Sequence, residues 1–111
     1  MQDVVFWKGI ERKEDYYVER MKMLIADASE QFAMSLADAL RGAYILRTAR
    51  DGREAMELVD SFRPDILVID LMLPGLDGIS VLRQTAAAGQ SPMVLAMSRY
   101  TSGTNIPGSR R

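Results

Sequence analysis

The sequence predicts an α/β fold in which four parallel strands between residues 22 and 98 form a doubly wound sheet. Two observations carry this prediction. Short runs of residues are apolar at every position, as in strands that are buried on both faces. Between these runs, apolar residues recur at three- and four-residue spacing, which is typical of helices with one buried face. Strands that alternate with such helices imply right-handed crossovers between parallel strands.

Three of the four predicted strands are continuous apolar runs, and each ends at an oxygen-bearing side chain. The runs, with the residue that follows each, are 23–26 before Asp27, 65–69 before Asp70, and 92–97 before Ser98. Apolar runs of this kind predict strands covered on both faces. Residues 44–49 alternate apolar and polar side chains, which predicts a strand at an edge of the sheet.

Three helices are predicted between the strands. Their apolar stripes are Phe32, Ala33, Leu36 and Leu40; Ala55, Leu58, Val59 and Phe62; and Ile79, Leu82 and Ala86. Ser29, Asp51 and Asp77 stand at the expected N-cap positions, and Gly42 and Gly89 stand just past two helix ends.

The predicted organisation is an N-terminal extension over residues 1–21, a folded domain over residues 22–98 and a tail over residues 99–111. In the extension, residues 3–7 favour a strand and residues 10–20 favour a helix, although propensity alone also allows one continuous helix. The tail is rich in Gly, Ser and Thr, so we expect it to be extended or mobile.

Composition excludes several kinds of chemistry. The 111 residues include no cysteine and no histidine, which rules out disulfides, thiolate nucleophiles and a Ser/His/Asp triad. Ten acidic and six basic side chains over residues 23–98 argue against a nucleic-acid-binding face. No apolar run approaches the ~20 residues that span a bilayer, so we expect a cytoplasmic protein that binds neither membrane nor nucleic acid directly.

The predicted strand ends bring together Asp27, Asp70 and Ser98. In an open parallel sheet these ends lie ~5 to 10 Å apart when the strands are neighbours. Two carboxylates, a hydroxyl and nearby carbonyls would form an oxygen site for a divalent ion. Asp27 alone is better explained by a helix start and Ser98 alone by a turn or cap, whereas Asp70 follows a buried strand and favours a functional role. We expect its carboxyl group to be open to solvent.

Several motifs accompany these residues in a fixed order. The longest follows the third strand and reads Asp70-Leu71-Met72-Leu73-Pro74-Gly75-Leu76-Asp77-Gly78. The others are Leu24-Ile25-Ala26-Asp27, Asp51-Gly52-Arg53-Glu54-Ala55, Arg63-Pro64-Asp65 and Ser98. Over about residues 22–98 this pattern resembles the receiver domains of bacterial response regulators, in which the phosphoacceptor aspartate is followed at the fourth position by proline and at the seventh and eighth by Asp-Gly.

The resemblance implies a flavodoxin-like fold with strand order 2-1-3-4-5. It also implies that Asp70 accepts a phosphoryl group from a histidine kinase or phosphotransfer protein. Asp27, Asp70 and the backbone carbonyl of Met72 would hold Mg²⁺, and Ser98 would hydrogen-bond the phosphoryl group. Such a domain is a signalling module rather than an enzyme. The first strand and helix also faintly resemble regulators of sporulation initiation, so transcriptional control would belong to a longer parent protein.

Two departures from the family pattern change these expectations. Ala28 stands where the family usually has a second carboxylate, which predicts weakened Mg²⁺ binding. A fifth strand ending in lysine is not found in residues 99–111, so the flavodoxin-like sheet is expected to be incomplete, with an exposed edge and face at its fourth strand. Either residues 4–7 supply an extra strand there and the following helix covers the face, or a homodimer buries the same surface.

The departures leave three functions open. The first is a phosphoaccepting receiver, and the second is a degenerate receiver that acts as a phosphorylation-independent dimerisation or binding module. The third is a flavodoxin-like domain that binds a small anionic ligand at the strand ends. The density of motifs favours the first two.

Overall fold

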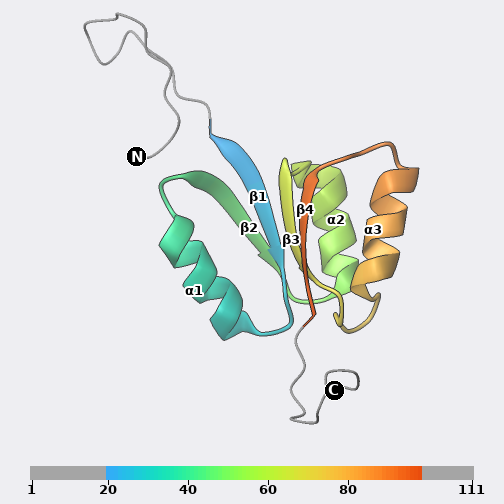
Figure 1. The fold of residues 1–111 in the computed structure, drawn as a ribbon, viewed down its shortest axis with the longest axis horizontal. Coiled ribbons are helices and arrows are strands. Elements are labelled where there is room, and N and C mark those ends of the chain that lie inside the picture. Colours follow the sequence, from blue (N-terminus) through green and yellow to red (C-terminus); the bar gives the residue numbers. More distant parts are fainter. Residues whose placement is uncertain (1–19, 99–111) are drawn as a thin grey trace, which may run out of the picture.

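The computed structural model describes residues 20–98, which form a four-stranded parallel sheet with strand order β2-β1-β3-β4 (Figure 1). The elements are β1 (Met21–Ala26), α1 (Glu30–Leu40), β2 (Tyr44–Ala49), α2 (Gly52–Phe62), β3 (Ile66–Asp70), α3 (Gly78–Ala87) and β4 (Met93–Met97). The predicted fold class is therefore confirmed. The strand predicted at residues 3–7, most of the helix predicted at 10–20 and the tail at 99–111 lie outside the described residues.

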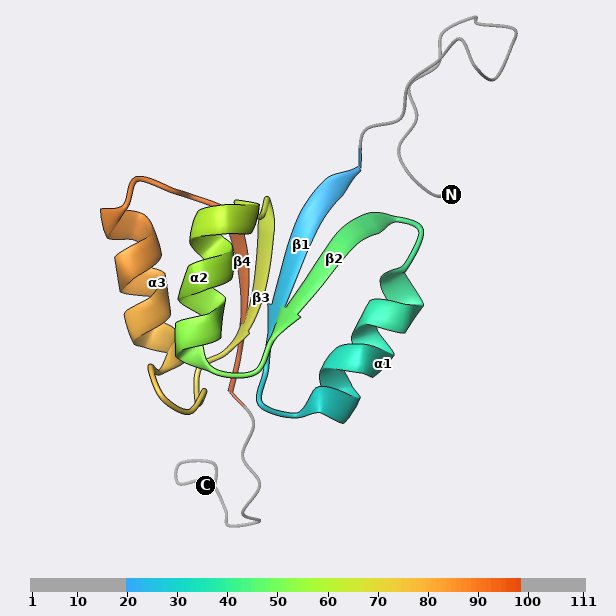
Figure 2. The ribbon, with the colours of Figure 1, turned by 180° about the vertical axis from the view of Figure 1, so that it is seen from behind.

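Helices cover the two faces of the sheet unequally. α1 lies on one face, and α2 and α3 lie side by side on the other (Figures 1 and 2). Side chains alternate between the faces along each strand. Leu24 and Leu67 belong to the core under α2 and α3, whereas Ile25 and Val68 belong to the core under α1. The prediction that strands are buried on both faces is correct for β3, whose five residues are all buried.

The same prediction is wrong for β4. Met93 is 62% exposed, Val94 41% and Leu95 51%. The reason is position, because β4 has a neighbouring strand on one side only among residues 20–98, and α1 packs mainly on β1 and β2. The expectation of an exposed edge and face at the fourth strand is confirmed for this part of the chain. The predicted edge position of β2 is confirmed as well.

The helix starts follow the predicted capping. The side chains of Ser29, Asp51 and Asp77 accept hydrogen bonds from the backbone N–H groups of Phe32, Glu54 and Ser80 at 3.1, 2.8 and 2.8 Å. Such caps satisfy N–H groups that the helix itself leaves unpaired. α2 ends at Arg63 with φ 51°, a left-handed conformation that the sequence did not signal because no glycine stands there.

Candidate functional site

Strand register places Asp27 and Asp70 side by side. Ala26, the last residue of β1, pairs with Ile69 in β3, so the residues that follow these two emerge together at the carboxyl edge of the sheet. Neighbouring strands lie ~4.8 Å apart, which sets the scale of the separation between the two backbones. The two predicted carboxylates therefore share one end of the sheet.

Both aspartates are buried. Asp27 is 0% exposed and Asp70 is 6% exposed, so the expectation that the Asp70 carboxyl group is open to solvent is wrong. β1 and β4 flank the end of β3, and the N–H of Leu71 donates to the carbonyl of Met97 at 2.8 Å, which continues the β3–β4 ladder just past Asp70. Asp27 Oδ1 accepts a hydrogen bond from the N–H of Ser29 at 2.8 Å. Burial of this kind is tolerated by a carboxylate only with such polar contacts.

The loop after β3 is tied to the Asp70 side chain. The N–H of Met72 donates to Asp70 Oδ1 at 2.9 Å, and the Met72 residue is 68% exposed. The backbone at Met72 is thus held next to the carboxylate while its side chain faces solvent. Asp70 consequently lies close to the solvent-facing rim of the site, although the aspartate itself is almost covered.

Ser98 lies at the same edge. It follows Met97, which pairs with Asp70 in the β3–β4 ladder, and it is exposed. All three predicted site residues therefore occupy the carboxyl end of the sheet, two buried and one exposed.

Two Asp-Gly pairs shape the loops around this end. Asp51-Gly52 begins α2 and Asp77-Gly78 begins α3, with the aspartate as cap in each pair. A Cβ atom on Gly78 would lie 2.5 Å from the backbone oxygen of Asp70, so only glycine lets α3 approach β3 this closely. A Cβ on Gly52 would overlap the backbone of Leu76.

The capping contact at Asp77 also affects its ionisation. The N–H of Ser80 donates to the Asp77 carboxylate, which stabilises the charged form and lowers the pKa of this side chain. The lowered pKa keeps Asp77 ionised as the cap of α3.

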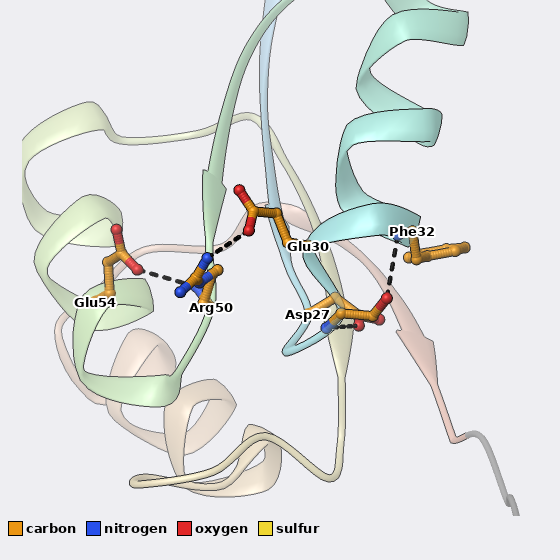
Figure 3. Close-up of polar contacts among 6 residues, drawn as sticks. Asp27, Glu30, Phe32, Arg50 and Glu54 are labelled. Atoms are coloured by element: carbon orange, nitrogen blue, oxygen red, sulfur yellow. Dashed lines mark hydrogen bonds and ion pairs between the residues drawn. The ribbon is translucent and has the colours of Figure 1, made fainter.

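Arg50 was not predicted as part of this region. Its guanidinium pairs with Glu30 at 2.7 Å, and its backbone N–H donates to Glu54 at 3.0 Å, so it links the starts of α1 and α2 (Figure 3). Glu30 precedes Arg50 by twenty positions, and no local pattern signals a contact of that range. Both charged side chains are more than half exposed, so the pair contributes little to stability.

The donor set suits a hard, oxygen-binding cation, although it includes fewer carboxylates than the family pattern has. The carboxylates of Asp27 and Asp70 and the carbonyl of Met72 are oxygen ligands of the kind Mg²⁺ accepts. Within residues 20–98, however, no three acidic side chains are grouped closely enough to hold a metal ion. A methyl group at Ala28 takes the place of a third carboxylate.

A cavity of about 370 Å³ lies at the opposite, amino end of the strands, where Met21, Asp65 and Pro92 are among its lining residues. In the described part of the chain, no helix is both long and apolar enough to cross a membrane.

A parallel α/β sheet with paired aspartates at its carboxyl edge and Asp-Gly loops beside them is the architecture of a receiver domain. Residues 23–106 match the family model of the response regulator receiver domain, and the chain belongs to this family. Receiver domains are signalling modules of two-component systems. The family match therefore confirms the resemblance and the predicted class of function.

Individual relatives agree with this assignment. Response regulator MprA of Mycolicibacterium vanbaalenii is 37% identical over 90 residues, covering 79% of this chain and 39% of that protein. Protein-glutamate methylesterase/protein-glutamine glutaminase 5 of Myxococcus xanthus is 34% identical over 84 residues, covering 73% of this chain and 24% of that protein. The chain thus spans two fifths or less of the length of these relatives.

Solved structures show the same fold. The receiver domain of Francisella response regulator 1452 matches with a TM-score of 0.68 at 30% identity, covering 76% of this chain and 70% of that one. The chemotaxis protein CheY4 of Vibrio cholerae matches with a TM-score of 0.68 at 26% identity, covering 77% and 73%. The predicted flavodoxin-like class is therefore confirmed.

Proposed function

We propose that this receiver domain accepts a single phosphoryl group on Asp70. The proposal is supported mainly by the strand register, which sets Asp27 beside Asp70 at the carboxyl edge of the sheet. In addition, the N–H of Met72 donates a hydrogen bond to the Asp70 carboxylate. Two carboxylates buried side by side cost free energy, and such an arrangement is typical of a functional site.

The reaction needs few parts from the protein. One Asp70 oxygen forms a bond to phosphorus, the bond between phosphorus and the donor's imidazole nitrogen or leaving oxygen breaks, and that donor atom keeps the electron pair. Charge on the transferring oxygens must be stabilised during this step. The hydroxyl of Ser98, the residue that follows β4, would donate to the phosphoryl oxygens.

Asp27, Asp70 and the backbone carbonyl of Met72 would hold Mg²⁺ in this site. When bound, the ion would neutralise charge on the phosphoryl oxygens. Because Ala28 contributes no ligand, this domain would bind the ion more weakly than a receiver with two adjacent carboxylates. The ordinary donor would be a histidine kinase or a phosphotransfer protein.

A specific observation favours a second function. The grouping of only two carboxylates suits a receiver that is no longer phosphorylated and acts through binding or dimerisation alone. The 6% exposure of Asp70 points the same way unless the rim at Met72 or Ser98 moves to admit the donor. These two functions make opposite predictions about Asp70.

Intact-mass spectrometry after incubation with a small acyl phosphate and Mg²⁺ separates them. We expect the mass of one phosphoryl group on the native chain, none on Asp70→Asn, and one on Asp65→Asn, which alters an aspartate at the other end of β3. A folded native chain that gains no phosphoryl mass supports the binding module and refutes the phosphoacceptor.

A further inference from the structure

The outer strand of the described sheet carries apolar side chains that nothing in residues 20–98 covers. Met93 and Leu95 are in register with Ile66 and Val68, which belong to the core under α1, so all four lie on the α1 face. Met93 is 62% exposed and Leu95 is 51% exposed. Neither charge nor proline interrupts β4, although exposed edges are usually protected in one of these ways.

We propose that the N-terminal segment of this same chain covers this surface, with residues 4–7 as a strand parallel to β4 on its outer edge and residues 10–18 as a helix over Met93 and Leu95. Most of this segment lies outside the residues that the structure describes. This packing on the sheet does not require phosphorylation at Asp70, so the two proposals are tested separately.

Crossover handedness selects the face. The connection from β1 to β2 runs toward the β2 edge with α1 on its face, whereas the connections from β2 to β3 and from β3 to β4 run the opposite way with α2 and α3 on the other face. A strand outside β4 that leads into β1 runs in the β1-to-β2 direction. A right-handed crossover therefore places its helix on the α1 face, where Met93 and Leu95 are exposed.

The length of the connecting chain fits this path. A nine-residue helix over residues 10–18 would measure ~14 Å, and a five-residue strand such as β4 measures ~17 Å, which leaves residues 19 and 20 to connect the helix to β1. The helix would thus return the chain from the carboxyl edge of the sheet to the amino edge, where β1 begins at Met21.

Composition favours this segment over the other end of the chain. Residues 4–7 are Val-Val-Phe-Trp, all strong strand formers, and Tyr16, Tyr17 and Val18 supply apolar area in the helix. Residues 101–111, by contrast, contain Ile106 as their one large apolar side chain.

Trp7 is the sole tryptophan of the chain, so its fluorescence reports directly on the proposed strand. In the native chain we expect blue-shifted emission and weak quenching by acrylamide. Leu95→Glu on β4 is expected to shift the emission toward that of an exposed indole. Ile45→Glu, at a 37% exposed position on the opposite edge strand, is expected to leave it unchanged.

Crosslinking keeps the test decisive if Leu95→Glu unfolds the domain. The chain has no cysteine, so a short bifunctional maleimide reacts only with engineered pairs. We expect an intrachain crosslink between Val5→Cys and Leu95→Cys, and none between Val5→Cys and Ile45→Cys. Solvent-exposed Trp7 emission in the native chain, or crosslinks that join two chains instead of one, would overturn the proposal.

Discussion

At the scale of single residues, the number of carboxylates in the acidic site depends on the residue at position 28. Two buried carboxylates, Asp27 and Asp70, meet at the sheet edge, and the residue after Asp27 is an exposed alanine. The side chain at this position lies on the solvent side of the site, so a carboxylate could be added there without being buried.

Ala28→Asp is expected to tighten Mg²⁺ binding by roughly 10- to 150-fold, because a contact between charged groups contributes about 1.5–3 kcal/mol. A titration followed by tyrosine and tryptophan fluorescence measures the change. Ala28→Asn is the matched control, since its side chain has the same shape without the charge, and it should change the affinity far less. Equal affinities for the native chain and Ala28→Asp would mean that the ion does not bind beside residue 27.

At the scale of elements, the start of α3 packs closely against the end of β3 at Gly78. The backbone there leaves no room for a side chain, since a Cβ would lie 2.5 Å from the Asp70 oxygen and 2.7 Å from the Leu71 Cα. A shift at the start of α3 would therefore displace the backbone of Asp70, the proposed phosphoacceptor. Asp77 holds this helix start in place by capping it.

Gly78→Ala is expected to lower the free energy of unfolding by about 1–3 kcal/mol through overpacking and to slow phosphoryl transfer to Asp70. Gly42→Ala supplies a control of similar cost, about 1–2 kcal/mol, because Gly42 has φ 98° but open space around it. Gly42 lies before β2, so this variant should be phosphorylated at the native rate. Urea denaturation and a phosphorylation time course measure the two effects. A native rate in Gly78→Ala would show that the contact does not position Asp70.

The elements themselves were largely predictable from sequence. Periodicity separated strands from helices, and Ser29, Asp51 and Asp77 marked the helix starts because their short side chains can bond N–H groups three residues on. Hydrophobic pattern did not reveal that β4 is exposed. A run of apolar residues shows what a strand could bury, whereas burial depends on which distant segment packs against it.

At the scale of the whole molecule, the site was predicted in position but not in environment. The rule that parallel strands gather ligands at their carboxyl ends brought Asp27, Asp70 and Ser98 to one edge. The near-complete burial of Asp70 was not foreseen, because it depends on β1 and β4, which flank the end of β3 only in the folded sheet. The Arg50–Glu30 link was missed for a similar reason, as its partners meet only after folding.

The central claim is that the buried carboxylate of Asp70 is the group that carries the phosphoryl. Locating the phosphoryl group in the phosphorylated chain tests it most directly, by reducing the acyl phosphate with borohydride and sequencing the peptides by tandem mass spectrometry. The account predicts one modified residue, Asp70, with Asp27, Asp65 and Asp77 unmodified. Modification at any of these three while Asp70 stays intact would contradict it.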